Sequence, residues 1–324
     1  MAAEWVGMAY LLFTLVFMAC VWSRLPNVVD MLVLRGGYIV ATLGAWAVYR
    51  HYPCKLTLFL RILVQMIFLS WWYPDTYELN RVLPNLDHVF AQWEQTLFGC
   101  QPSLLFSQKV SYGWFSELMC LGYISYFPLM LVVYLYYFLR RYEEFQMAAF
   151  VMLGSFFAYY VVFVLLPVTG PQFYYLAVGT EKIAAGIFPN LGDWFLTHSE
   201  RMAAPGWSDG FCYHLLDITH DAGERPTAAF PSSHVGVTTV LMMLALRTKS
   251  WKLTGGMLPF YLLMCLSTVY IYAHYAIDAI AGLVSGIAIY YVLCALYRAK
   301  GNGQKQKNGT PLSPKPLLTL NLIL

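Results

Sequence analysis

Eight long stretches of apolar residues dominate the chain. Each has about the 20 residues that a helix needs to cross roughly 30 Å of hydrocarbon. We predict spans near 5–23, 31–50, 56–74, 114–139, 147–168, 231–248, 252–273 and 276–297. The fourth contains Pro128 and the sixth begins at Pro231, so we expect a kink in one and a sharp start in the other. The pattern predicts an all-α polytopic membrane protein with about eight transmembrane helices.

Three segments interrupt this pattern. Residues 80–108 mix charges with Leu, Val, Phe and Trp, which is typical of one or two helices lying along the membrane interface. Residues 168–230 are polar, with Gly, Pro and Asp, and predict an ordered loop outside the cytoplasm. We therefore divide the chain into N-terminal transmembrane helices (1–75), a core that includes the loop (76–298) and a cytoplasmic tail (299–324) that is disordered in its first half.

Composition narrows the class of protein. Only 11% of the 324 residues are charged and 59% are hydrophobic, whereas a soluble domain carries about 25% charge. The net charge is +3 and no basic stretch has interleaved aromatic residues, which argues against a nucleic-acid partner. The seven cysteines show no metal-binding spacing, and a disulfide between Cys100 and Cys212 is left open. Membrane is the environment that this composition requires.

Charge also predicts the orientation. Eight spans place both termini on one side, and the segments on that side carry twelve of the twenty Lys and Arg residues against six on the other. The positive-inside rule puts both termini in the cytoplasm. The loop 168–230 then lies on the periplasmic or lumenal face.

Two short strings on that outer face have the residues for phosphoryl chemistry. In the string HYAID, Asp278 follows His274 by four residues, and on a helix it is placed to accept the Nδ1 hydrogen of His274 and leave Nε2 as a nucleophile. In the string PSSH, Ser232 and Ser233 suit a helix start whose free amides bind phosphate, and His234 suits a general acid.

Each string has an ordinary explanation as well. A lone HxxxD or PSSH occurs often by chance, and a histidine near a lipid boundary commonly just bonds a backbone carbonyl. The pair is more informative because both strings open helices on the same face, one hairpin apart. The loop also carries His198, His214 and His220 with Asp193, Asp209, Asp217 and Asp221, which leaves a divalent-metal site as a weaker alternative.

The two strings carry a resemblance to a known family. FPSSHVG (230–236) and VYIYAHYAIDAIAG (269–282) resemble the second and third signature motifs of the type 2 phosphatidic acid phosphatase superfamily. LPNLDHVFAQWEQTLFG (83–99), LGYISYF (121–127) and PVTGPQFYY (167–175) resemble its inositol phosphorylceramide synthase branch. The resemblance implies a phosphatidic acid phosphatase-like helical bundle as the catalytic core and no metal or other cofactor.

The resemblance also implies roles for the site residues. His274 is implied as the nucleophile that forms a phosphohistidine, Asp278 as its orienting acid and His234 as the proton donor to the departing lipid alcohol. Backbone amides and hydroxyls at Ser232 and Ser233 are implied to hold the phosphate.

The chain departs from the family pattern in its cations. The phosphatases typically carry an Arg where Thr268 stands, and the synthase-like branch leads us to expect a basic residue where Gln172 stands. Arg225, Lys182 and Arg201 are the available substitutes, and Arg225 is our first candidate because it precedes the PSSH helix start. Arg225 and Gln172 therefore join the predicted phosphate-binding residues.

The function expected from the resemblance is transfer of a phosphorylated head group, such as inositol phosphate, from a glycerophospholipid to a ceramide-like lipid. Two alternatives stay open. A lipid phosphate phosphatase would use water as the acceptor, and a non-enzymatic lipid-binding protein would keep the fold without turnover.

Overall fold

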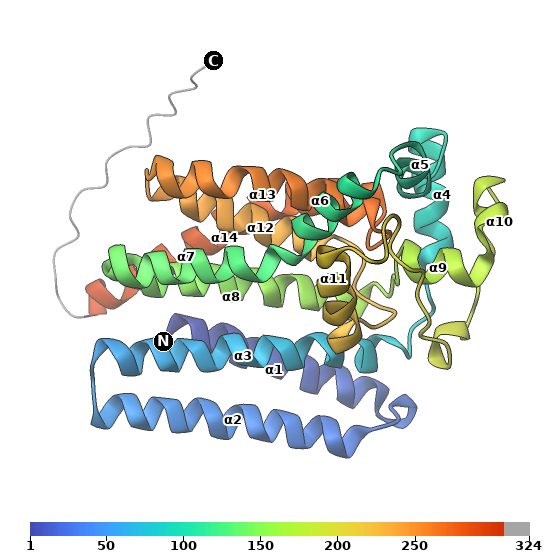
Figure 1. The fold of residues 1–324 in the computed structure, drawn as a ribbon. Helices are drawn as coiled ribbons and strands as arrows, with labels where there is room; N and C mark the ends of the chain where they lie inside the picture. The colour runs from blue at the N-terminus through green and yellow to red at the C-terminus, as the bar shows by residue number, and fades with distance from the viewer. Residues whose placement is uncertain (308–324) are drawn as a thin grey trace.

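The computed structural model describes the backbone of residues 1–307 and the side chains of residues 1–300 except Ala222. The described chain is all-α, and most of its long helices run side by side as a bundle (Figure 1). Its elements are α1 (Ala2–Val21), η1 (Trp22–Arg24), α2 (Val28–His51), α3 (Lys55–Asn80), α4 (Asp87–Phe98), α5 (Pro102–Lys109), α6 (Gly113–Ile124), α7 (Tyr126–Arg140), α8 (Tyr142–Leu165), α9 (Pro171–Val178), α10 (Thr180–Ala184), η2 (Trp194–Leu196), α11 (Phe211–Gly223), α12 (Ser233–Arg247), α13 (Trp251–Tyr270) and α14 (Ala276–Lys307).

Six helices in the described part of the chain are long and apolar enough to cross a membrane: α1, α2, α3, α8, α13 and α14. The pair α6 and α7 is bent by 42° and makes a seventh span if counted together. The bend lies at Ser125, one turn before Pro128. Pro128 has no N–H to donate to the carbonyl of Ile124, so the predicted kink has its physical cause here.

The predicted eighth span is not confirmed. The apolar run 231–248 becomes α12, which has only 15 residues and is about 22 Å long. Helix α12 is shorter than its apolar run because Ser232 ends the preceding extended segment and caps the helix. It packs among α7, α8, α13 and α14, and most of its side chains are buried by protein.

The predicted segment boundaries need correction. Helix α3 continues to Asn80, so the division between residues 75 and 76 falls inside a helix. Helix α14 continues to Lys307, so the start of the tail is helical and not disordered. Residues 308–324 of the predicted tail lie outside the described residues. The segment 80–108, predicted to hold one or two interfacial helices, contains two short helices, α4 and α5.

Two buried arginines lie within the N-terminal helices, and both are paired. Arg35 of α2 donates to both carboxylate oxygens of Asp75 in α3, at 3.0 and 2.8 Å. Arg61 of α3 forms an ion pair with Glu4 of α1. Buried charges are costly without partners, so these pairs fasten α1, α2 and α3 to one another.

The short helices gather at one end of the bundle, where α4, α5, α9, α10 and α11 lie (Figure 1). We call it the loop end, defined by residues 81–112 and 166–232 together with the link between α13 and α14. Both histidine strings reach this end.

Candidate active site

The structure brings His234 and His274 together at the loop end. His234 is in the first turn of α12, and His274 lies in the link between α13 and α14. Nε2 of His274 lies 3.4 Å from Nδ1 of His234, and the ring centroids are 5.6 Å apart. The convergence predicted from the spans is therefore present, although 40 residues separate the two positions.

The orientation of His274 corrects one prediction. Its Nδ1 lies 2.8 Å from the carbonyl oxygen of Ala229 and 3.7 Å from Oδ2 of Asp278. That Oδ2 accepts the amide of Tyr275 at 2.9 Å. The helical i, i+4 geometry does not hold because α14 begins at Ala276, after His274. Asp278 therefore lies near the imidazole without being its hydrogen-bond acceptor.

The tautomer of His274 follows from this contact. A carbonyl oxygen can only accept, so Nδ1 carries the hydrogen and Nε2 carries the lone pair. Burial lowers the pKa of His274 to about 4, against the opposing effects of the Ala229 carbonyl and the Glu224 carboxyl. The imidazole is neutral near pH 7, with Nε2 available as a nucleophile.

Aromatic rings hold His234 from the side of the bent span. Tyr123 of α6 and Tyr126 of α7 lie 4.5 and 4.6 Å from the His234 ring, centroid to centroid. Both tyrosines belong to the string LGYISYF, which the bend at Ser125 wraps around His234. On its other side, Tyr123 meets the ring of His220 at 5.4 Å.

Of the two predicted phosphate-binding serines, Ser232 already forms hydrogen bonds with backbone groups of the protein. Its hydroxyl accepts the amide of Val235, and its own amide donates to the carbonyl of Asp278. Ser232 thus caps α12 and ties it to α14. Ser233 lines a large cavity beside His234, described below, and remains a candidate phosphate-binding residue.

Gln172 has a partner that the sequence did not indicate. Its side-chain Nε2 donates to Oε1 of Glu224 at 2.9 Å, and its backbone N–H donates to the carbonyl oxygen of Tyr272. The neighbouring Arg225 is exposed, and its guanidinium donates to the backbone carbonyl of Glu224. The position expected to hold a cation therefore holds an amide that binds a carboxyl group.

Among the other candidate cations, Arg201 contacts His220, which lines the cavity beside His234. Its Nε donates to Nδ1 of His220 at 3.4 Å, while Nη2 pairs with Asp217 at 2.6 Å and with Asp221 at 3.1 Å. The DxxxD pair therefore holds an arginine. Lys182 is exposed on α10, and at Thr268 the contact with His274 is only a backbone hydrogen bond.

A cavity of about 740 Å³ ends at His234. Its walls are mainly apolar side chains of α3, α7 and α8, and its polar end comprises Ser233, His234, His220 and Glu224. The volume lies within the roughly 300–1,000 Å³ typical of small-molecule sites. A cavity with apolar walls and one polar end suits an amphiphile whose head group reaches His234.

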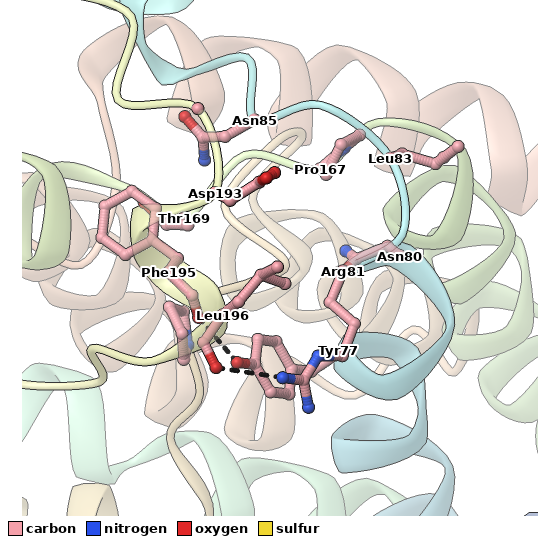
Figure 2. Close-up of a pocket in the computed structure, with 12 residues that line it drawn as sticks. Tyr77, Asn80, Arg81, Leu83, Asn85, Pro167, Thr169, Asp193, Phe195 and Leu196 are labelled. Carbon is pink, nitrogen blue, oxygen red and sulfur yellow. Dashed lines mark hydrogen bonds between the residues drawn. The ribbon is translucent and has the colours of Figure 1, made fainter. Parts of the chain in front are cut away.

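A much smaller cavity lies where α3 meets the loop around η2 (Figure 2). Its volume is about 30 Å³, the share of one water molecule. The Tyr77 hydroxyl donates to the carbonyl of Phe195, and Arg81 donates to the carbonyl of Leu196 (Figure 2). These hydrogen bonds fasten the loop to α3. The cavity itself is too small for a substrate.

Two buried carboxyl groups of α4 support the HYAID segment. Asp87 accepts the amides of Thr169 and Gly170 at 2.7 and 2.9 Å, and the hydroxyl of Tyr275 at 3.1 Å. Glu94 accepts the amide of Ile277 at 3.2 Å. Both belong to the string at 83–99, whose structural role is thereby explained: it holds the start of α14.

The comparison with protein families gives a match that covers this site. The family model described as the PAP2 superfamily matches residues 88–292, which is more than half of the chain. Neither a curated protein nor a solved structure was found to match. The matched range begins in α4 and ends in α14, and it contains both histidines.

Proposed function

Because the chain belongs to the PAP2 superfamily, we propose that it is a membrane lipid phosphotransferase that works through a phosphohistidine on His274. One observation carries the proposal. A neutral imidazole with its lone pair on Nε2 touches a second imidazole that closes an apolar cavity. Lipid phosphatase or phosphotransferase activity is what membership of this family suggests.

In the first half of the proposed reaction, Nε2 of His274 attacks phosphorus and the bond to the diacylglycerol oxygen breaks. His234, in its protonated form, gives a proton to that oxygen and so makes the diacylglycerol a better leaving group. A phosphoryl group does not fit between nitrogens 3.4 Å apart. We therefore expect His234 to turn when the donor binds, which opens His274 to the cavity.

The acceptor separates transfer from hydrolysis. The cavity is lined mainly by apolar side chains, so it favours an acceptor that comes from the bilayer. We propose a glycerophospholipid with a phosphorylated head group, such as inositol phosphate, as the donor and a ceramide-like lipid as the acceptor. The charge asymmetry supports a site on the periplasmic or lumenal face with both termini in the cytoplasm.

The test is a lipid assay of the full-length protein in detergent. We expect phosphatidylinositol with ceramide to yield a new phosphosphingolipid, and His274→Ala to abolish it. His214→Ala is the matched control, because His214 is exposed on α11. Release of inositol phosphate or free phosphate irrespective of ceramide would favour a phosphatase. A product rate that His274→Ala leaves unchanged would refute the phosphohistidine.

A further inference from the structure

A carboxyl group stands where this kind of site ordinarily needs a cation. Glu224 follows the end of α11 and lines the same cavity as Ser233 and His234. Its Oε1 is held by Nε2 of Gln172. The Gln172 backbone is itself fixed, because its carbonyl accepts the amide of Met202. The position of Glu224 is therefore set by the surrounding chain.

A carboxylate in this position repels the phosphate of any bound substrate, because like charges a few ångströms apart raise the energy of both. The same carboxylate stabilises a hydrogen-bond donor such as a hydroxyl group. Of the groups in a phosphoryl-transfer reaction, the acceptor alcohol is the one that must lose a proton. This is the partner that suits Glu224.

The ionisation of Glu224 suits such a role. Burial raises its pKa to about 7, while facing groups lower it: the imidazole of His274, the hydrogen bond from Gln172 and the charges of Arg201 and Arg225. A general base is most effective when its pKa is near the working pH. The carboxyl group is thus ionised in a substantial fraction of molecules near pH 7.

We propose that Glu224 is the catalytic base of the second half-reaction: it binds the acceptor hydroxyl and takes its proton as the acceptor oxygen attacks the phosphohistidine. This rests on the function proposed above. The new bond joins the acceptor oxygen to phosphorus, and the broken P–N bond returns its electron pair to Nε2 of His274. His234 has given its proton to the diacylglycerol, so the proton on Glu224 must pass to His234 before the next cycle. Both side chains line one cavity, which gives that proton a short path.

The chemistry of the acceptor follows from the route to Glu224. The carboxyl group lies at the polar end of the apolar cavity. A long-chain amphiphile with a hydroxyl group close to its apolar part can place its chain between α3, α7 and α8 and its hydroxyl at Glu224. Because one cavity serves this end of the site, the diacylglycerol leaves before the acceptor enters.

The two half-reactions can be measured separately with full-length protein and phosphatidylinositol labelled in its phosphate. Rapid quenching traps label on the protein in the first step, and a ceramide chase measures its discharge in the second. We expect Glu224→Gln to acquire label at a rate within about threefold of the unsubstituted protein. We expect ceramide to discharge that label about 100-fold more slowly, which is the usual contribution of a general base. Glu200→Gln is the matched control, since Glu200 is exposed in the same loop.

Each other outcome has a defined meaning. Discharge from Glu224→Gln at the unsubstituted rate overturns the role of Glu224 and leaves the phosphohistidine intact. Loss of labelling in Glu224→Gln, with the chain still monodisperse in detergent, also overturns it, because the carboxyl group would then act in the first step. Absence of label from the unsubstituted protein refutes the proposed function itself.

Discussion

Substitution of Gly282 by Ala tests whether helix packing sets the position of His234. Gly282 lies on the face of α14 that meets α12, and a Cβ there would lie 2.4 Å from the carbonyl oxygen of Ser232. Ordinary van der Waals contact begins near 3.4 Å, so the two backbones must separate by about 1 Å. Ser232 is two residues before His234, and the displacement is expected to carry His234 away from His274.

The size of the effect follows from that displacement. Overpacking of this kind costs about 1–3 kcal/mol of stability. A misplacement of about 1 Å in a catalytic constellation costs about 100-fold in rate. We therefore expect Gly282→Ala to fold in detergent with a lowered Tm and to lose about two orders of magnitude in kcat.

Lipid product formation and thermal unfolding in detergent measure the two effects. The control is Gly255→Ala on α13, where a Cβ would meet nothing within 4 Å. Since Ala stabilises a helix interior by about 1 kcal/mol over Gly, the control is expected to keep full activity and at least the original Tm. A Gly282→Ala protein with activity within threefold of the original would refute the reasoning.

Substitutions at three further positions test the surroundings of the site. Asp278→Asn is expected to lower kcat about 10- to 100-fold, less than the ~10⁴-fold seen where the carboxylate alone selects the tautomer, because the Ala229 carbonyl selects it here. Burial raises the pKa of Glu94 to about 8, so this carboxyl is mostly protonated at pH 7. Glu94→Gln should therefore change the unfolding free energy little, whereas Glu94→Ala leaves the amide of Ile277 unpaired at a cost of about 1–3 kcal/mol. Arg225→Ala should keep kcat/KM within threefold, because this exposed side chain donates to a backbone carbonyl.

The length and composition of the apolar runs predicted most of the fold. Six of the eight runs appear in the described chain as helices long and apolar enough to span a membrane. The fourth, bent near its proline as predicted, makes a seventh if its two helices count as one span. The run 231–248 is not confirmed as a span, because hydropathy does not register where a helix is capped and the helix that forms has only 15 residues. Ser232 shortens that run at one end, and most side chains of the resulting helix are buried against neighbouring helices. An apolar pattern alone cannot distinguish burial by protein from contact with lipid.

The site was predictable where its residues lie in short strings and not where contacts cross the chain. His234 and His274 were found from their strings and from the count of crossings between them. The carbonyl of Ala229 carries no side-chain signal, and it lies 45 residues from His274. Glu224 gave no motif either, since its partner Gln172 is 52 residues away. Gln172 was predicted to bind phosphate, and in the structure its side chain binds the carboxyl group of Glu224.

The glycines that end both histidine strings explain why those strings extend beyond the chemical groups. A Cβ on Gly236 would lie 1.7 Å from the hydroxyl of Tyr159, which donates to the carbonyl of Gly282. A Cβ on Gly286 would lie 2.5 Å from the carbonyl oxygen of Gly236. Helices α12 and α14 thus meet with almost no side chain between their backbones, and the Tyr159 side chain of α8 packs into the same contact. Close backbone contact between α12 and α14 therefore helps to set the distance between the two imidazoles, and it leaves no room for a methyl group at Gly282.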